Sequence, residues 1–124
     1  MKKFIQGFLF ALLTFAAGFA VVTMISRPHV EKECRETLLK QDLQAMRKAI
    51  DQYTADKEEL PQSLEDLVTM GYIREIPIDP ITSEPDWKVD IEEDTISRQG
   101  GQGVVDVHSS ASGVSISGTP FEEF

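Results

Sequence analysis

The sequence predicts an α+β protein in which a long N-terminal helix packs on a small antiparallel β-sheet. Two observations predict the helix: no charged side chain occurs from Phe4 to Ile25, and residues 31–54 contain no glycine or proline. A third predicts the sheet, because apolar and charged residues alternate from Trp87 to Glu92 with the period of two that marks a half-buried strand. At 124 residues, the chain has room for one modest globular domain beyond the apolar segment.

The composition is acidic, with 21 Asp and Glu against 12 Lys and Arg and a formal net charge of -9. An acidic surface repels the phosphates of nucleic acids, so we expect no nucleic-acid partner. The single cysteine, Cys34, cannot form an internal disulfide. The globular domain must therefore be held by packing, helix caps or a metal.

The uncharged segment from Phe4 to Ile25 is long enough to span roughly 30 Å of hydrocarbon as a helix, which predicts a membrane span. Basic residues lie on both sides of it, so their distribution alone does not set its orientation. We expect the acidic body after it to be exported. The alternative is a secretory signal cut after Gly18-Phe19-Ala20, which has the small-x-small pattern of such cleavage sites.

The second half of the helix is predicted to be amphipathic. Apolar residues recur there at alternating steps of four and three, which places them on one stripe of a helix, and such stripes usually form the core. The predicted core consists of this stripe and the tryptophan of the first strand: Leu39, Leu43, Met46, Ile50, Tyr53 and Trp87.

A short second helix is predicted from Leu64 to Met70. Ser63 and Asp66 have the spacing of a capping arrangement at its start, and Gly71 can adopt the left-handed conformation that ends it. The prolines that follow exclude a helix and favour an extended crossing toward the sheet; they are Pro77, Pro80 and Pro85.

Three short strands are expected in the sheet. The first contains Trp87, Val89 and Ile91 on its apolar face, the second covers Thr95 to Arg98, and the third covers Val104 to Val107. The glycines at 100, 101 and 103 predict a hairpin loop before the third strand. Two aromatic residues of the tail, Phe121 and Phe124, are expected to cap the core.

The N-terminus resembles a known signal. Lys2-Lys3, then Gly7-Phe8, then an apolar helix are similar to the class III signal of type IV pilins and type II secretion pseudopilins. The resemblance implies cleavage between Gly7 and Phe8, a leader of residues 1–7, a membrane and filament-core helix of residues 8–28, and a periplasmic pilin-like domain of residues 29–124. Pro28 lies near the family's helix-kinking proline. Leu12 stands where the family has a glutamate.

The middle of the chain resembles the major pseudopilins of type II secretion. The resemblance rests on an ordered series: Leu60-Pro61, Leu64 to Val68, Gly71-Tyr72-Ile73, Ile76-Pro77-Ile78-Asp79-Pro80 and Trp87. It implies a single-pass protein of the inner membrane that does no catalysis and polymerises with copies of itself and other pseudopilins. A prepilin peptidase and an inner-membrane assembly platform are its other implied partners.

Calcium is the one cofactor that the resemblance suggests, because residues 106–124 resemble the loop where major pseudopilins hold it. The predicted ligands are Asp106, Ser110 and Ser117. Calcium prefers six to eight oxygen ligands with several carboxylates. Here serines replace the acidic loop residues typical of that site, so a hydrogen-bonded serine loop without metal is the main expectation.

Two further functions stay open. The apolar helix can instead be a permanent anchor for a periplasmic adaptor that binds another protein, and Leu12 favours that alternative. A small anchored hydrolase is suggested only by the series Asp106-Val107-His108-Ser109-Ser110. Neighbouring residues of a strand point to opposite faces, so this series cannot form a catalytic triad without a distant group.

Overall fold

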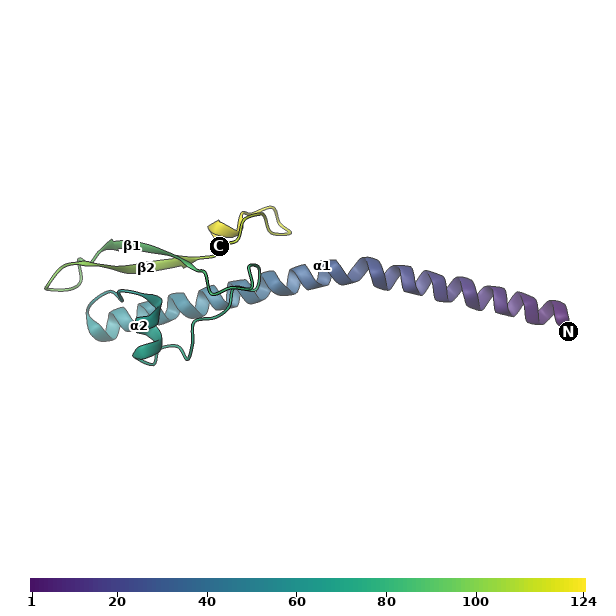
Figure 1. Ribbon diagram of the computed structural model, residues 1–124, viewed down its shortest axis with the longest axis horizontal. Coiled ribbons are helices and arrows are strands. Elements are labelled where there is room, and N and C mark those ends of the chain that lie inside the picture. The colour runs from purple at the N-terminus through teal and green to yellow at the C-terminus, as the bar shows by residue number, and fades with distance from the viewer. The chain divides into compact units, whose positions relative to one another are not determined.

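The protein is α+β, with a long helix packed on a two-stranded antiparallel sheet (Figure 1). The computed structural model describes residues 1–8 and 29–124 with their side chains. The elements are α1 (Lys2–Lys57), α2 (Leu64–Thr69), β1 (Lys88–Glu93), β2 (Gln102–His108) and a short 3-10 helix, η1 (Phe121–Glu123). The chain divides into two units, Met1–Cys34 and Arg35–Phe124, whereas the sequence placed the boundary at 28 and 29.

The first unit contains the start of α1. Its described apolar side chains are exposed, with Phe4 at 89% and Phe8 at 72% of their full accessible surface. In the part of the chain whose side chains are described, no helix has the length and hydropathy that a bilayer crossing requires. The predicted span of residues 8–28, with Leu12 and the predicted kink before Pro28, lies outside the described residues apart from Phe8.

The second unit, which we call the head, is built around the C-terminal part of α1. The predicted stripe on this helix is its buried face, since Leu39, Leu43 and Met46 are almost fully inaccessible. Ile50 and Tyr53 continue the stripe and are also buried. The stripe packs against residues from every other part of the head: Leu64, Leu67, Val104, Val107, Ala111 and Phe121.

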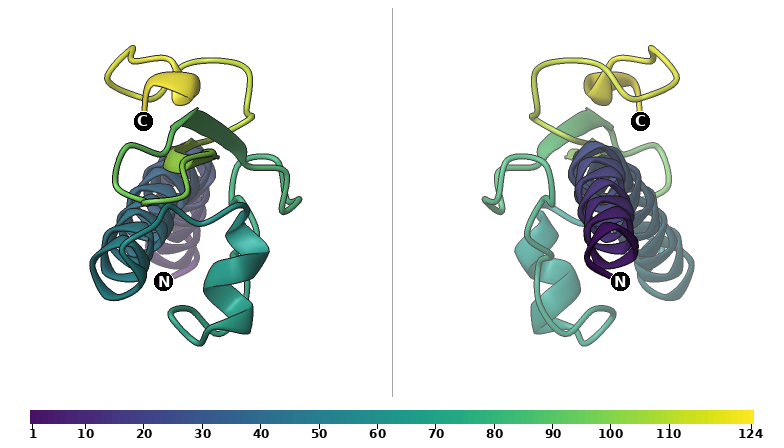
Figure 2. Two further views of the ribbon diagram at one scale, coloured as in Figure 1. Left: turned by 90° about the vertical axis from the view of Figure 1, so that its left-hand side faces the viewer. Right: turned by 90° about the vertical axis from the view of Figure 1, so that its right-hand side faces the viewer.

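Helix α2 and the hairpin cover different sides of α1 (Figures 1 and 2). At the end of α2, Gly71 has a φ of +81°, as predicted. Its N–H donates to Val68 O at 3.1 Å, and the N–H of Tyr72 donates to Leu67 O at 2.8 Å. These two bonds form a Schellman motif, which satisfies carbonyls at the end of the helix.

The start of α2 differs from the predicted capping arrangement. Ser63 occupies the N-cap position but makes no side-chain hydrogen bond there. Asp66 reaches back instead and accepts a hydrogen bond from the N–H of Gln62 at 2.8 Å. Of the two reciprocal hydrogen bonds of a capping box, only the one accepted by the acidic side chain is present. Its donor is the N–H of Gln62, one residue before the N-cap.

The sheet has two strands, so the prediction of three is wrong. β1 pairs directly with β2, and the ladder shifts register between Asp90 and Ile91. Beyond this shift Ile91 is 56% exposed, which corrects its predicted place on the buried face. Val89 packs on the core, and beyond the shift the buried valine of the sheet is Val104 of β2.

Residues 95–98 form a turn because a buried carboxylate organises their backbone. Asp94 Oδ1 accepts hydrogen bonds from the N–H groups of Ile96 at 3.0 Å and Ser97 at 2.9 Å. Such contacts from Asp to the backbone two and three residues on replace ladder hydrogen bonds. Asp94 Oδ2 accepts from the N–H of Leu60 at 2.9 Å, so the same side chain also ties the turn to the segment after α1.

Gly103 lies in β2 and not in the hairpin loop. A Cβ atom at this position would lie 2.3 Å from Leu60 Cβ. Any residue other than glycine would therefore force the backbone to shift. The close approach allows the N–H of Val104 to donate to Pro61 O at 2.7 Å. Gly103 is therefore required for contact between two segments of the head.

We expect Leu43→Ala to lower the free energy of unfolding by about 2–5 kcal/mol, because it opens a cavity beneath the buried stripe. Leu38→Ala is the matched control, since Leu38 lies on the same helix and is 45% exposed, and it should change stability by less than about 0.5 kcal/mol. Urea denaturation followed by circular dichroism measures both. Equal losses in the two variants would contradict the assignment of the core.

Candidate functional site

The predicted processing site lies on the exposed start of α1. Gly7 is helical, and a Cβ atom there would meet no other atom within 4 Å. Phe8 is exposed beside it. Both residues are therefore accessible on the described surface, as a peptidase would require.

The predicted core residues lie where the sequence placed them, with one difference of degree. Trp87 is half-buried and packs at the edge of the core. Its indole N–H donates to Pro77 O at 2.8 Å, which fixes the loop before β1 to the segment after α2. Tyr53 and Tyr72 place their rings 5.5 Å apart, and the hydroxyl of Tyr72 donates to Asp56 at 2.9 Å.

The three predicted calcium ligands bond to three different sets of partners. Asp106 accepts a hydrogen bond from Arg47, and Ser110 donates to Asp86 Oδ2 at 2.5 Å. Ser117 shares a 2.7 Å hydrogen bond with Ser115. Among the described residues, no three histidine, cysteine or acidic side chains are grouped as a metal would need. Calcium binding stays a prediction.

The loop that contains Ser117 is organised by hydroxyl groups. Ser115 is 3% exposed, and its Oγ accepts from the N–H of Thr119 at 3.2 Å. On α1, Glu36 accepts a 2.7 Å hydrogen bond from the N–H of Ile116. The carboxylate attaches this loop to the long helix.

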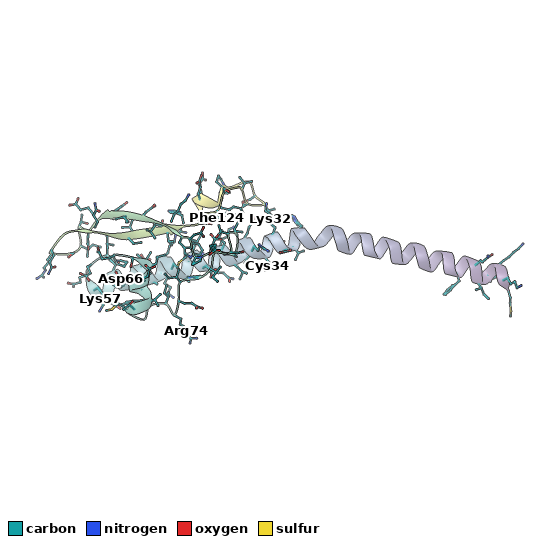
Figure 3. The ribbon with its side chains drawn as sticks, in the orientation of Figure 1. Lys32, Cys34, Lys57, Asp66, Arg74 and Phe124 are labelled. Carbon is teal, nitrogen blue, oxygen red and sulfur yellow. The ribbon has the colours of Figure 1, made fainter. Side chains whose placement is uncertain are left out.

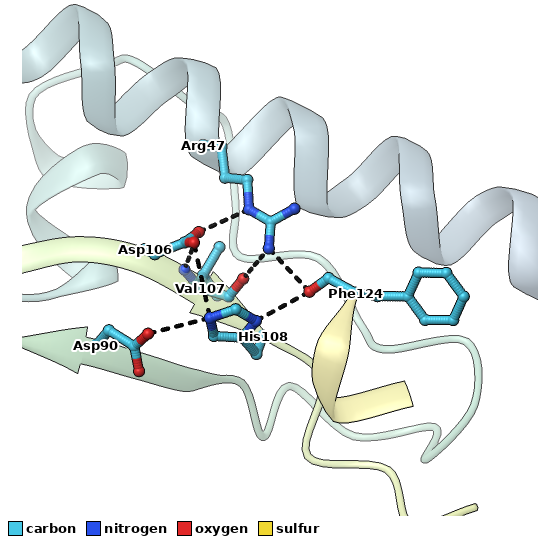
Figure 4. A network of polar contacts seen from close by, with 6 residues as sticks. All are labelled: Arg47, Asp90, Asp106, Val107, His108 and Phe124. Atoms are coloured by element: carbon cyan, nitrogen blue, oxygen red, sulfur yellow. Dashed lines mark hydrogen bonds and ion pairs between the residues drawn. The ribbon is translucent and has the colours of Figure 1, made fainter. Parts of the chain in front are cut away.

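A polar network joins α1, both strands and the tail (Figure 4). Arg47 Nε donates to Asp106 Oδ1 at 2.6 Å, and Arg47 Nη2 donates to Val107 O at 3.0 Å and Phe124 O at 2.8 Å. His108 contacts Phe124 O through Nδ1 at 2.9 Å and Asp90 Oδ2 through Nε2 at 3.1 Å. One guanidinium thus connects three segments of the chain, as its fork of donors allows.

The network stabilises the charged form of Asp106. Burial alone would raise the pKa of this carboxyl, but hydrogen bonds from Arg47 and the N–H of Val107, with the charge of Arg47, hold it below its usual value. Lys40 of α1 places its Nζ 4.8 Å from the centre of the Phe124 ring. Figure 3 labels Phe124 in the part of the head that contains α1. The tail is therefore attached to the helix by both charge and packing.

In the suggested hydrolase series, Asp106 and His108 contact each other at 3.6 Å, whereas the two serines bond to aspartates of another segment. The hydroxyl of Ser109 donates to Asp79 Oδ2 at 2.5 Å, and that of Ser110 donates to Asp86. Asp79 is fully buried and also accepts from the N–H of Ile81 at 2.7 Å. These hydroxyls thus hold the loop before β1 against the end of β2.

Sequence reasoning missed Arg47, Asp79 and Asp94. Arg47 follows the buried Met46 directly, so the period of the helix places it at the flank of the apolar stripe. From that position the guanidinium of Arg47 can reach the sheet that covers the stripe, and this was the available signal in the sequence. For the two aspartates, the available signal was an acid followed by Pro-Ile-Thr or Thr-Ile-Ser, a composition typical of turns.

Comparison with known proteins gives no family: no protein-family model, curated protein or solved structure matches the chain.

We expect Arg47→Ala to lower the free energy of unfolding by about 1–2 kcal/mol, because it removes the hydrogen bonds that Arg47 donates to Asp106 and to two main-chain oxygens. Arg47→Lys should recover only part of this loss, since an ammonium cannot reproduce the fork. Lys48→Ala, at the next and exposed position, is the control and should be nearly neutral. Chemical denaturation of the full-length chain measures all three, and a neutral Arg47→Ala would show that the network adds no stability.

Acid should destabilise the head. The folded-state pKa of Asp94 is lowered chiefly by the hydrogen bond from the N–H of Leu60 and then by that from Ser97. Hydrogen bonds also lower the pKa of Asp86, chiefly from Ser110 and then from Thr82. A lowered folded pKa gives stability that is present above about pH 4 and is lost as pH falls through the folded value. Asp42 acts in the opposite sense, because burial and then the charge of Asp79 raise its pKa.

The variant Asp94→Asn tests this dependence. It should be less stable than the unmodified chain at pH 7 and should lose less stability between pH 5 and pH 3, since the carboxylate that protonates is gone. Thermal unfolding across that pH range is the measurement. Parallel curves for the two proteins would mean that Asp94 does not contribute to acid sensitivity.

Proposed function

We propose that this chain is a structural subunit of a pilin-like filament, a pseudopilin of a type II secretion-type machine, and that it acts by assembly. In this proposal it is a single-pass protein of the inner membrane with its head in the periplasm. Its partners are copies of itself, other pseudopilins, the prepilin peptidase and the inner-membrane assembly platform.

One observation carries the proposal: a single helix, α1 from Lys2 to Lys57, extends from an exposed apolar start into the core of an acidic head. Leu43 and its neighbours fix the head to the helix, whereas Phe4 and Phe8 are exposed. Exposed apolar side chains of this size mark contact with a membrane or another protein. The same helix is thus suited to carry a head at one end and to pack with copies at the other.

A permanently anchored periplasmic adaptor is the second candidate. Leu12 favours it, because the family's glutamate at this position pairs with the N-terminal amine of a neighbouring subunit. Without that carboxylate, assembly depends on apolar packing and on contacts between heads. The two candidates differ in whether the leader is removed.

Intact-mass analysis of the chain from membranes that contain a prepilin peptidase separates the candidates. We expect loss of residues 1–7 and the gain of one methyl group on Phe8. Gly7→Val should remain uncut, because it places a bulky side chain beside the cleaved bond. Gly18→Val should be processed normally.

Each of the remaining outcomes assigns the chain to a different class of protein. An uncut chain in all three samples supports the permanent anchor and contradicts the pseudopilin proposal. A mature chain that begins at Val21, with cleavage blocked by Gly18→Val and not by Gly7→Val, shows secretion by signal peptidase.

A further inference from the structure

The loop at residues 113–120, which we call the tail loop, has its apolar and polar side chains reversed. Val114 is 50% exposed and Ile116 is 42% exposed, whereas Ser115 between them is buried. A hairpin that packs on its own core buries its apolar face. Here the loop is closed by a bridge between Val114 and Pro120, and its apolar pair is presented outward.

The tail loop also lies in a stretch without charge. Residues 107–121 contain no aspartate, glutamate, lysine or arginine, although the whole chain carries 21 acidic residues. Two acidic residues, Glu122 and Glu123, follow the stretch directly and are exposed. The tail loop is therefore an apolar surface with a negative border.

A second surface with few acidic residues lies on the head, on the side of α1 opposite the buried stripe. Its residues recur at steps of three and four and are all exposed, so they form one continuous strip on the helix. We call this strip the outer face: Leu38, Gln41, Ala45, Lys48, Gln52 and Ala55. It contains one lysine and no carboxylate, with Asp51 and Asp56 at its margin.

The outer face is not covered by the tail loop of its own chain. Within one copy the loop is attached to α1 through Glu36, which lies on a different side of the helix from Lys48. Leu38 stays 45% exposed in that arrangement. The outer face is therefore open to contact from another molecule.

We propose that the tail loop of one copy packs on the outer face of α1 in a second copy. This inference rests on the proposed filament function and names the contact between its heads. Heads of the same acidic charge repel one another, so they approach with least cost where carboxylates are few. Val114 and Ile116 then cover Leu38 and Ala45.

The charges at the borders of the two surfaces are complementary. Lys48 lies on the outer face one turn beyond Ala45, and Glu122 and Glu123 follow the tail loop. Glu122 already has a weak partner in Lys88 at 3.7 Å, which leaves Glu123 as the main partner of Lys48. Because two different surfaces meet, the contact is heterologous and can repeat from copy to copy without closing.

Cross-linking between copies tests the contact directly. In a full-length Cys34→Ser chain assembled in membranes with its partner proteins, Leu38→Cys and Ile116→Cys are combined and treated with a short bismaleimide. We expect covalent multimers from this pair and only monomers from each single variant. A control pair replaces Leu38→Cys with Ile78→Cys, which is 62% exposed and lies outside the outer face, and should give no multimers.

Charge reversal provides a second measurement that does not depend on cysteine geometry. Lys48→Glu and Glu123→Lys should each lower the yield of the cross-linked product several-fold, and the two together should restore it. Equal yields in all four chains would overturn the pairing of Lys48 with Glu123.

Electron microscopy of the same membranes separates failure of this inference from failure of the proposed function. Filaments without the product from Leu38→Cys and Ile116→Cys overturn the inference and leave the filament function in place. Absence of both filaments and product overturns both. Filaments together with the product, lost in either charge variant and restored in the double variant, support the contact.

Discussion

The head depends on the burial of one stripe of α1. Leu39, Leu43 and Met46 are almost fully inaccessible, and they touch α2, β2 and the tail in one cluster. The sheet has only two strands, and an isolated hairpin of that size is at best marginally stable. The long helix therefore serves as the surface on which the hairpin, α2 and the tail become ordered.

Polar contacts add to this packing and hold the loops and the tail in place. Asp94 and Asp79 are buried carboxylates that accept hydrogen bonds from backbone N–H groups and from one serine, and Arg47 ties β2 and the tail to the helix. Buried charges are tolerated when they are paired in this way. The single cysteine cannot form an internal disulfide, so these contacts and the core packing hold the segments of the head together.

Much of the fold could be predicted because period and turn chemistry are local. Spacing and residue type predict three features correctly: the stripe from Leu39 to Tyr53, the end of α2 at Gly71, and the strands β1 and β2. The strand predicted at residues 95–98 was wrong because Asp94 captures that backbone. The bonds from Ile96 and Ser97 are local and leave a turn-like composition as their signal, but the bond from Leu60, which is distant in the sequence, could not be predicted from spacing.

The candidate sites also differ in how much of them could be predicted from local sequence. Gly7 and Phe8 are exposed, and cleavage between them stays a prediction, whereas Asp106, Ser110 and Ser117 bond to separate partners. The resemblance to the calcium-holding loop of the major pseudopilins had implied that these three residues share one ion. Arg47, which lies 59 residues before Asp106, could not be paired with it from spacing, because the contact exists only after the hairpin packs on α1.

In the proposed function, one helix has two roles: its far end organises an acidic head, and its apolar start packs with copies of itself. Cross-linking through the apolar segment tests this claim most directly. A Val21→Cys, Cys34→Ser chain would be oxidised in membranes that contain the peptidase and assembly proteins, with the chain lacking both cysteines as the control. If the helices of many copies pack together, the disulfide at Val21→Cys joins neighbouring copies in pairs, and additional cross-linking of the heads joins these pairs into a ladder of multimers. The ladder should depend on Val21→Cys. Isolated monomers or a single dimer would contradict the account.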